Sequence, residues 1–322
     1  MEQHLIGETA AIVVSLLWSL CSILFAYAGN RVGIWSLNAI RMLMALGLLG
    51  TAHIILLGTI IPAANQSQWF YLGLSGIIGL ALGDVGYFGC LLYLGPRKGV
   101  LVMSTHPIIS ALVGFAVLHE VMGPWAILGM ALCLSGVTLV VLERQEPEDD
   151  RTPKKKGREK RWSAEEARKR KIYGVILGTA GSVAQGFGLV ISKYGMLDAA
   201  SDNAAPLDPL SATFMRIIVA VIFFWVAMLF VRKMPEVMKG FKDRKALGSM
   251  FGGAIVGPFL GVWLSMVAVS YALAGIAATL MSLMPIMIIP IVWLLYRQGT
   301  NWRGIIGAVI AIIGVAVIFL VP

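Results

Sequence analysis

Charged side chains are scarce in this sequence of 322 residues, and their scarcity excludes a water-soluble fold. Asp, Glu, Lys and Arg make up only 13% of the chain and hydrophobic residues make up 58%, whereas roughly a quarter of a soluble domain is charged. Moreover, 12 of the 26 Lys and Arg lie in the single stretch 143–172, which leaves little charge to cover the rest. We therefore expect a polytopic membrane protein whose surroundings are the lipid bilayer.

Cysteine is also rare, and catalytic signatures are missing. Cys21, Cys90 and Cys133 lie inside apolar runs without paired spacing, which is typical of packing residues rather than disulfides or metal ligands. No H-E-x-x-H motif, nucleophile elbow or phosphate loop occurs. The net charge of +9 lies mainly in loops between apolar runs, where anionic headgroups explain it better than nucleic acid does. We predict no enzymatic activity, no cofactor, no metal and no nucleic-acid partner.

Long apolar runs, in contrast, fill most of the sequence. A bilayer core of about 30 Å needs about 20 apolar residues in a helix. Ten segments meet this requirement: 9–29, 34–57, 69–92, 99–118, 124–142, 173–193, 210–231, 247–273, 276–296 and 303–321. Their length favours helices over barrel strands. The first ten residues contain no Lys or Arg, so we expect a retained first helix rather than a secretory signal.

The two halves of the sequence repeat each other at an offset of 178 residues. The aligned pairs are Gly79 with Gly257, Gly83 with Gly261, Tyr93 with Tyr271, Met103-Ser104 with Met281-Ser282, Pro107-Ile108 with Pro285-Ile286, Gly129 with Gly307, and Gly136-Val137 with Gly314-Val315. We predict an all-α fold of ten transmembrane helices in two five-helix repeats, 1–142 and 173–322, joined by a charged linker at 143–172. Because five is odd, the repeats are inverted, an arrangement common in transporters with a binding site near the midplane.

Basic residues are distributed unequally between the two sides predicted for these helices. The loops after helices 1, 3, 5, 7 and 9 hold 23 of the 26 Lys and Arg, and the opposite side holds only Lys193. By the positive-inside rule, the linker faces the cytoplasm and both termini face outward, in an inner or plasma membrane.

The linker itself has two readings. Ser163 and Glu166 fit a capping box, so a short helix is expected to lead into helix 6. The linker is then a solvated, orienting segment. Alternatively, Lys154–Lys156 and Arg168–Lys171 contact anionic lipid or a regulator, although the acidic run Glu146–Asp150 opposes contact with lipid.

Several stretches resemble the EamA-like repeat of the drug/metabolite transporter superfamily. They are GLALGDVGYFGCLLYLG (79–95), HPIISALVGFAVLHE (106–120), the counterpart of both in the second half (261–298), and the glycine-spaced RGIIGAVIAIIGVAV (303–317). The resemblance implies ten helices in inverted halves around a central cavity that moves small metabolites, often outward. The acidic residue that usually ends this repeat is present as Glu120 but is replaced by Gln298 in the second copy.

Asp84 is the leading candidate for chemistry, because a carboxylate at membrane depth is costly and marks function by default. It lies within the third run, Tyr87 follows one helical turn later, and its counterpart in the repeat is Val262. One interpretation is a proton-coupling or substrate-binding carboxylate. The other is a structural hydrogen bond to a neighbouring helix.

Arg41 and Arg216 occupy similar places in helices 2 and 7 and, with inverted repeats, lie near opposite surfaces. Each could extend to headgroups or pair with another helix, and Arg41 could partner Asp84. Alternatively, the two guanidinium groups attract anionic parts of a substrate at the two mouths.

Two prolines mark bends in helices 4 and 9. Pro107 follows His106, and Pro285 occupies the matching place. Proline removes a backbone donor, so a kink is expected that frees carbonyl groups toward a cavity. His106 could carry protons or be a hydrogen-bonded packing residue.

Aromatic and glycine residues complete the candidates. Trp18, Tyr87, Trp263 and Tyr271 either line a cavity or pack within the bundle and against lipid. Glycines at four-residue spacing in helices 3 and 8 predict close helix packing.

We interpret the chain as an exporter of small organic metabolites that works by alternating access, with proton coupling through Asp84, as a monomer or homodimer. The alternative is a non-transporting membrane scaffold or receptor that acts through the charged linker.

Overall fold

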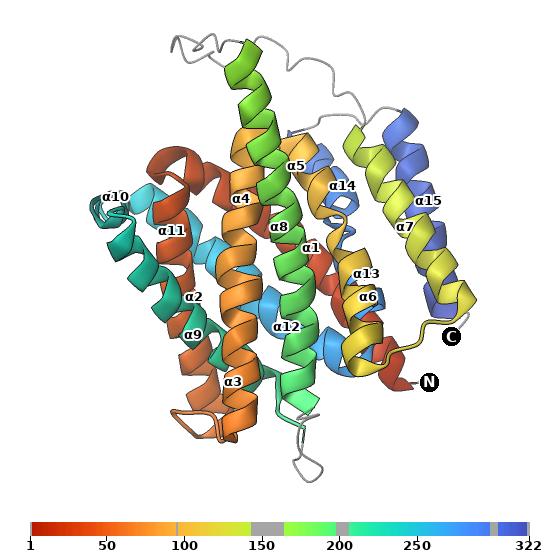
Figure 1. The fold of residues 1–322 in the computed structure, drawn as a ribbon, viewed down its shortest axis with the longest axis horizontal. Coiled ribbons are helices and arrows are strands. Elements are labelled where there is room, and N and C mark those ends of the chain that lie inside the picture. Colours follow the sequence, from red (N-terminus) through yellow and green to blue (C-terminus); the bar gives the residue numbers. More distant parts are fainter. Residues whose placement is uncertain (1, 95, 143–163, 198–205, 297–301, 321–322) are drawn as a thin grey trace.

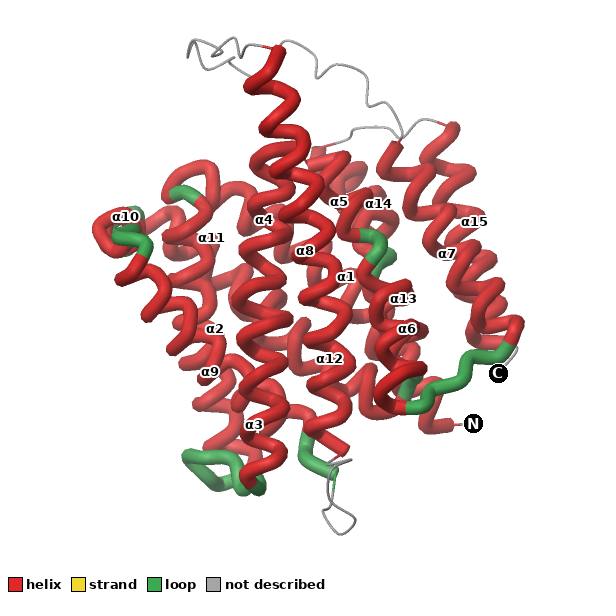
Figure 2. The backbone as a smooth tube through the Cα atoms, viewed as in Figure 1, coloured by secondary structure: helices red, strands yellow, loops and turns green. Residues whose placement is uncertain are grey.

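A computed structural model describes residues 2–94, 96–142, 164–197, 206–296 and 302–320. Within these residues the fold is helical and contains no strand. Ten helical stretches are long and apolar enough to cross a membrane: 3–32, 34–57, 66–91, 99–118, 124–142, 168–197, 209–230, 244–271, 274–291 and 302–320. The ten runs predicted from the sequence are therefore confirmed (Figures 1 and 2).

Several spans consist of more than one helical element. The first half contains α1 (Glu2–Val32), α2 (Ile34–Leu57), α3 (Gln66–Ser75), the π-helical η1 (Gly76–Leu82), α4 (Gly83–Leu94), α5 (Pro96–Met103), α6 (His106–Leu118) and α7 (Pro124–Leu142). The second contains α8 (Ala164–Leu197), α9 (Pro209–Phe230), α10 (Met234–Gly240), α11 (Arg244–Ala254), the π-helical η2 (Ile255–Phe259), α12 (Leu260–Tyr271), α13 (Ala274–Met281), α14 (Met284–Tyr296) and α15 (Trp302–Leu320).

The repeat seen in the sequence is also a repeat of structure. Elements α5, α6 and α7 begin and end 178 residues before α13, α14 and α15, without a gap. Both copies of the third span also contain a π-helical segment, η1 in one and η2 in the other. The chain therefore forms two five-helix repeats, and the odd number of spans inverts one relative to the other.

Helix packing interleaves the two repeats. α1 of the first half packs along α11 and α12 of the second, while α8 of the second packs along α3, η1 and α4 of the first. Glycine permits these approaches: a Cβ on Gly79 would lie 3.1 Å from Gly188 Cα, and one on Gly129 would lie 2.9 Å from Gly314 O. The predicted glycine faces thus lie where helices of opposite repeats touch.

The two ends of the bundle differ in what they carry. α8 begins at the end that we call the linker face, and α1 begins and α15 ends at the opposite end, the terminus face (Figure 1). The 34 residues of α8 span about 51 Å at 1.5 Å per residue, longer than the bilayer core of about 30 Å. Residues 143–163, including Ser163 of the expected capping box, lie outside the described residues, and α8 begins at Ala164.

Helices 4 and 9 are broken rather than bent. Pro107 is the second residue of α6 and Pro285 is the second residue of α14, and a short turn separates each from α5 or α13. Proline is favoured in a first turn because its missing N–H has no helical acceptor there. The carbonyl groups at the first break accept hydrogen bonds from Ser182 of α8, at 3.0 Å for Val102 O. The expected kinks are therefore interruptions, closed by a helix of the other repeat.

Candidate functional site

An ion pair buried between helices 2 and 3 joins two of the predicted residues. Asp84 is the second residue of α4, directly after η1, and its Oδ2 receives a charge-assisted hydrogen bond from Arg41 Nη2 of α2. The two side chains are 17% and 10% exposed. Segments of π-helix are frequent at functional sites, and here η1 delivers Asp84 to its partner.

The guanidinium of Arg41 is held on every side. Its Nε donates to Asn38 Oδ1 at 2.8 Å, and its Cζ lies 5.4 Å from the ring centre of Phe25 and 5.5 Å from that of Phe88. These contacts combine a charged pair, a neutral hydrogen bond and two cation–π interactions. Since α1, α2 and α4 all contribute, the group also ties three spans together.

Arg216 has a very different environment, although it too is the eighth residue of its helix, α9. It is 3% exposed. Its Nη1 donates to Met266 Sδ at 2.9 Å, and its Nε has no hydrogen-bond partner among the described residues. The structure therefore separates the two arginines: one is neutralised by a carboxylate and the other is not.

A second buried ion pair lies toward the terminus face, and the sequence analysis did not select it. Lys193 Nζ of α8 lies 2.6 Å from Glu120 Oε1 and donates to Ala272 O at 2.6 Å. Glu120 Oε2 accepts the N–H of Ala274, the first residue of α13, at 2.7 Å. Glu120 reaches this position because His119 ends α6 in the left-handed conformation, with φ of 53°. The pair thus links α6 and α8 to the start of α13.

This ion pair borders a cavity of about 670 Å³ that also includes the candidate Tyr271. The cavity is lined by the first residues of α1, the ends of α6 and α8, and the junction of α12 with α13. Two signals in the sequence pointed here: Lys193 was the only basic residue predicted on its side, and Glu120 occupies the acidic end of the repeat. Neither signal identified the partner, because the two residues belong to different repeats.

The remaining candidates are dispersed through the bundle. His106 Nδ1 lies 3.0 Å from Met103 O at the break in helix 4. Tyr87 packs against Phe88 with ring centres 5.1 Å apart. Trp263 lies 6.1 Å from Phe259, and Trp18 contacts the α12 surface at Gly261. The structure therefore does not gather all candidates around one cavity.

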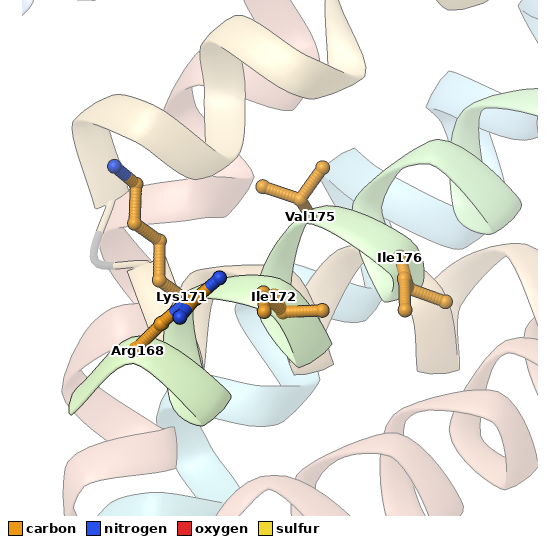
Figure 3. Close-up of a pocket in the computed structure, with 5 residues that line it drawn as sticks. All are labelled: Arg168, Lys171, Ile172, Val175 and Ile176. Atoms are coloured by element: carbon orange, nitrogen blue, oxygen red, sulfur yellow. The ribbon is translucent and has the colours of Figure 1, made fainter. Parts of the chain in front are cut away.

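The first residues of α8 form a shallow hollow of about 420 Å³ near the linker (Figure 3). Arg168 and Lys171 lie on the turns before Ile172, Val175 and Ile176 (Figure 3). Exposed apolar side chains below basic ones are typical of a helix leaving a membrane, where long cationic side chains extend to the headgroups. The hollow therefore fits a lipid boundary.

No group of three His, Cys, Asp or Glu side chains close enough to hold a metal ion occurs among the described residues. The cysteines Cys21, Cys90 and Cys133 are buried and free, as predicted.

Comparison with known proteins agrees with this architecture. The model of the EamA-like transporter family matches residues 5–142 and 172–320. A solved structure described only as "Crystal structure of protein" is similar with a TM-score of 0.71 and 15% sequence identity, over 98% of this chain and 96% of that one; at this identity the likeness concerns the fold alone. No curated protein matches the chain significantly.

Proposed function

Because the chain belongs to the EamA-like transporter family, and is therefore a membrane transporter of the drug/metabolite kind, we propose that it exports small organic metabolites by alternating access. Inverted repeats that interleave through glycine contacts can rock against each other about a site near the midplane. The division into repeats at 1–142 and 173–322, with a linker between them, belongs to the same proposal.

The observation that carries the mechanism is the Arg41–Asp84 pair. It is buried, it follows a π-helical segment, and it ties three spans of the first half. Its carboxylate can take a proton only when the arginine withdraws, because the positive charge beside it favours the ionised form. Opening the pair therefore couples a conformational change to proton uptake, which is how Asp84 serves an exporter driven by a proton gradient.

Two inter-repeat ion pairs support alternating closure. At the terminus face, Glu120 and Lys193 are 10% and 9% exposed. At the linker face, Arg31 Nε lies 2.8 Å from Asp243 Oδ2, with side chains 41% and 25% exposed. An exposed pair stabilises little, whereas breaking a buried one is costly. We infer that the terminus face is the more firmly closed in this structure and that the linker face opens more readily.

The orientation follows from charge. With the linker in the cytoplasm of an inner or plasma membrane and both termini outside, the firmly closed face is the external one. Export then begins with solute entry from the linker face, which this state leaves easier to open.

The transport function is tested by comparing metabolites inside and outside cells that lack or overproduce the protein. A transported solute should accumulate inside the deleted cells and outside the overproducing cells. Asp84→Asn should abolish this redistribution at normal protein levels, whereas Glu236→Gln, which alters an exposed carboxylate paired with Lys233, should leave it unchanged. Equal redistribution in Asp84→Asn and the unaltered protein would remove the role of Asp84.

The alternative, a scaffold acting through the linker, makes the opposite prediction. Deleting part of 143–163 would abolish the cellular phenotype of a scaffold, and no solute would move with or without the deletion. A transporter should keep its solute redistribution after the deletion, because the linker lies outside the helical bundle.

A further inference from the structure

Arg216 is a buried cation without a counter-ion among the described residues. Its guanidinium carries five N–H donors and stays charged in proteins. The hydrogen bond that satisfies it best goes to a methionine sulfur, which is a weak acceptor. No carboxylate of the described chain lies within ion-pair distance of it. An uncompensated charge at this depth is strongly unfavourable, so the site lacks a component in the state observed.

The inverted repeat provides an internal comparison. Arg41 and Arg216 are both the eighth residue of equivalent helices. In the first repeat, the Nε and Nη2 of Arg41 bind Asn38 and Asp84. In the second repeat the position equivalent to Asp84 is Val262. The fold has therefore kept the arginine in both copies while keeping the acid in only one.

The unoccupied edge of Arg216 has the geometry that binds an oxyanion. Nε and Nη2 lie on one edge of a guanidinium, and this edge binds two oxygens of a carboxylate or phosphate side-on. Nε has no partner, and Nη1, on the other side, is the nitrogen that donates to Met266. Nη2 faces η1 at Gly79, where a Cβ would lie 3.4 Å from it. The surface opposite the free edge therefore carries no side chain.

Arg216 also lies where moving parts meet. Its helix packs on η1 of the first repeat and on α12 of the second. Gly79 of η1 is itself in contact with Gly188 of α8. A ligand between these elements contacts both repeats, so relative movement of the repeats alters its access.

We propose that Arg216 binds an oxyanion of the transported solute, a carboxylate or a phosphate, through its Nε and Nη2 at the crossing of η1, α8, α9 and α12. The inference rests on the proposed transport function and gives it a substrate class, small organic anions. Binding neutralises the buried guanidinium, so the loaded site loses the charge that makes the empty one unfavourable to bury.

The test measures the thermal stability of the purified protein in detergent with propionate, inorganic phosphate or propionamide, at equal ionic strength. Propionate or phosphate should raise the melting temperature, and the uncharged propionamide should not. The arm that responds distinguishes a carboxylate from a phosphate ligand. Arg216→Met should raise the melting temperature without ligand, since it removes an unpaired buried charge. Its affinity for the responding anion should fall about ten- to hundredfold, the effect of losing charged hydrogen bonds.

Arg216→Lys, which keeps the charge but loses the fork, should retain a weaker response, and Glu236→Gln should respond like the unaltered protein. The proposal is overturned if no oxyanion stabilises the unaltered protein, or if Arg216→Met responds equally. Export of neutral solutes alone in the cell comparison would reject this inference and leave transport standing. Anion binding through Arg216 without any solute redistribution would reject transport and leave the site standing.

Discussion

At the scale of single residues, the account depends on how each buried charge is neutralised. Arg41 has Asp84, Lys193 has Glu120, and Arg216 has a methionine sulfur. Moving an ion out of water costs several kcal/mol, and a partner recovers that cost only with good geometry. The first two residues therefore stabilise the observed state through their partners, whereas the third is a place where stability is given up, as is common for a ligand site.

A double-mutant cycle on the first pair tests this reasoning. Asp84→Asn and Arg41→Gln each leave one charge buried without a partner, and each should destabilise the protein by about 3–5 kcal/mol. The double variant removes both charges and should recover most of the loss. Unfolding in detergent, followed by tryptophan fluorescence, gives the coupling energy. Additive losses would show that the pair does not interact energetically.

The double variant also separates stability from transport. It should fold nearly as well as the unaltered protein and yet move no solute, because no titrating carboxylate remains at the pair. Restored transport in the double variant would give the pair a purely structural role.

At the scale of helices, contact between the repeats depends on glycine. α7 and α15 pack closely along Gly129, Gly136, Gly307 and Gly314. A Cβ on Gly136 would lie 2.6 Å from Ala311 N and closer still to Gly307 O. These neighbours are backbone atoms, which cannot turn aside as a side chain can, so the two helices must separate to admit even a methyl group.

Gly136→Ala should therefore destabilise the protein by about 1–3 kcal/mol, the usual cost of overpacking. Gly248→Ala is the matched control, because nothing lies within 4 Å of a Cβ at that helical position. Thermal unfolding of the two variants side by side gives the difference. Equal melting temperatures would mean that α7 and α15 are not packed as described.

The sequence predicted the spans and their repeat because both depend on patterns along the chain: span length follows from bilayer thickness, and Gly and Pro kept their register over 178 residues. It did not predict the breaks before Pro107 and Pro285, since the turns there are stabilised by serine from another helix. It also did not predict η1 and η2, which depend on how the spans pack. The Glu120–Lys193 pair was missed for the same reason: its partners meet only across the two repeats.

One asymmetry between the repeats is nevertheless readable once the structure is known. Glu120 accepts the N–H of Ala274. In the other copy the equivalent positions are Gln298 and Pro96, and proline has no N–H to donate. The loss of the acid therefore accompanies the loss of its donor, so a lock of this kind belongs to the terminus face.

At the scale of the whole molecule, the placement of charge predicts an orientation. A reporter enzyme that is active only outside the cytoplasm should work when fused after Pro322 and fail when inserted between 150 and 160. The opposite insertion, of a cytoplasmic reporter, should give the reverse pattern. A C-terminal fusion active in the cytoplasm would contradict the orientation and exchange the faces assigned to solute entry and release.

The central claim is that this bundle moves a solute and that Asp84 couples the movement to protons. The most direct measurement is the uptake of the solute found in the cell comparison by liposomes that contain the purified protein, with and without an imposed proton gradient. We predict protein-dependent uptake that the gradient accelerates when protons move opposite to the solute, and no such acceleration in the stable Arg41→Gln/Asp84→Asn variant. Uptake no faster than in protein-free liposomes would contradict transport, and an equal response to the gradient in both proteins would contradict coupling through Asp84.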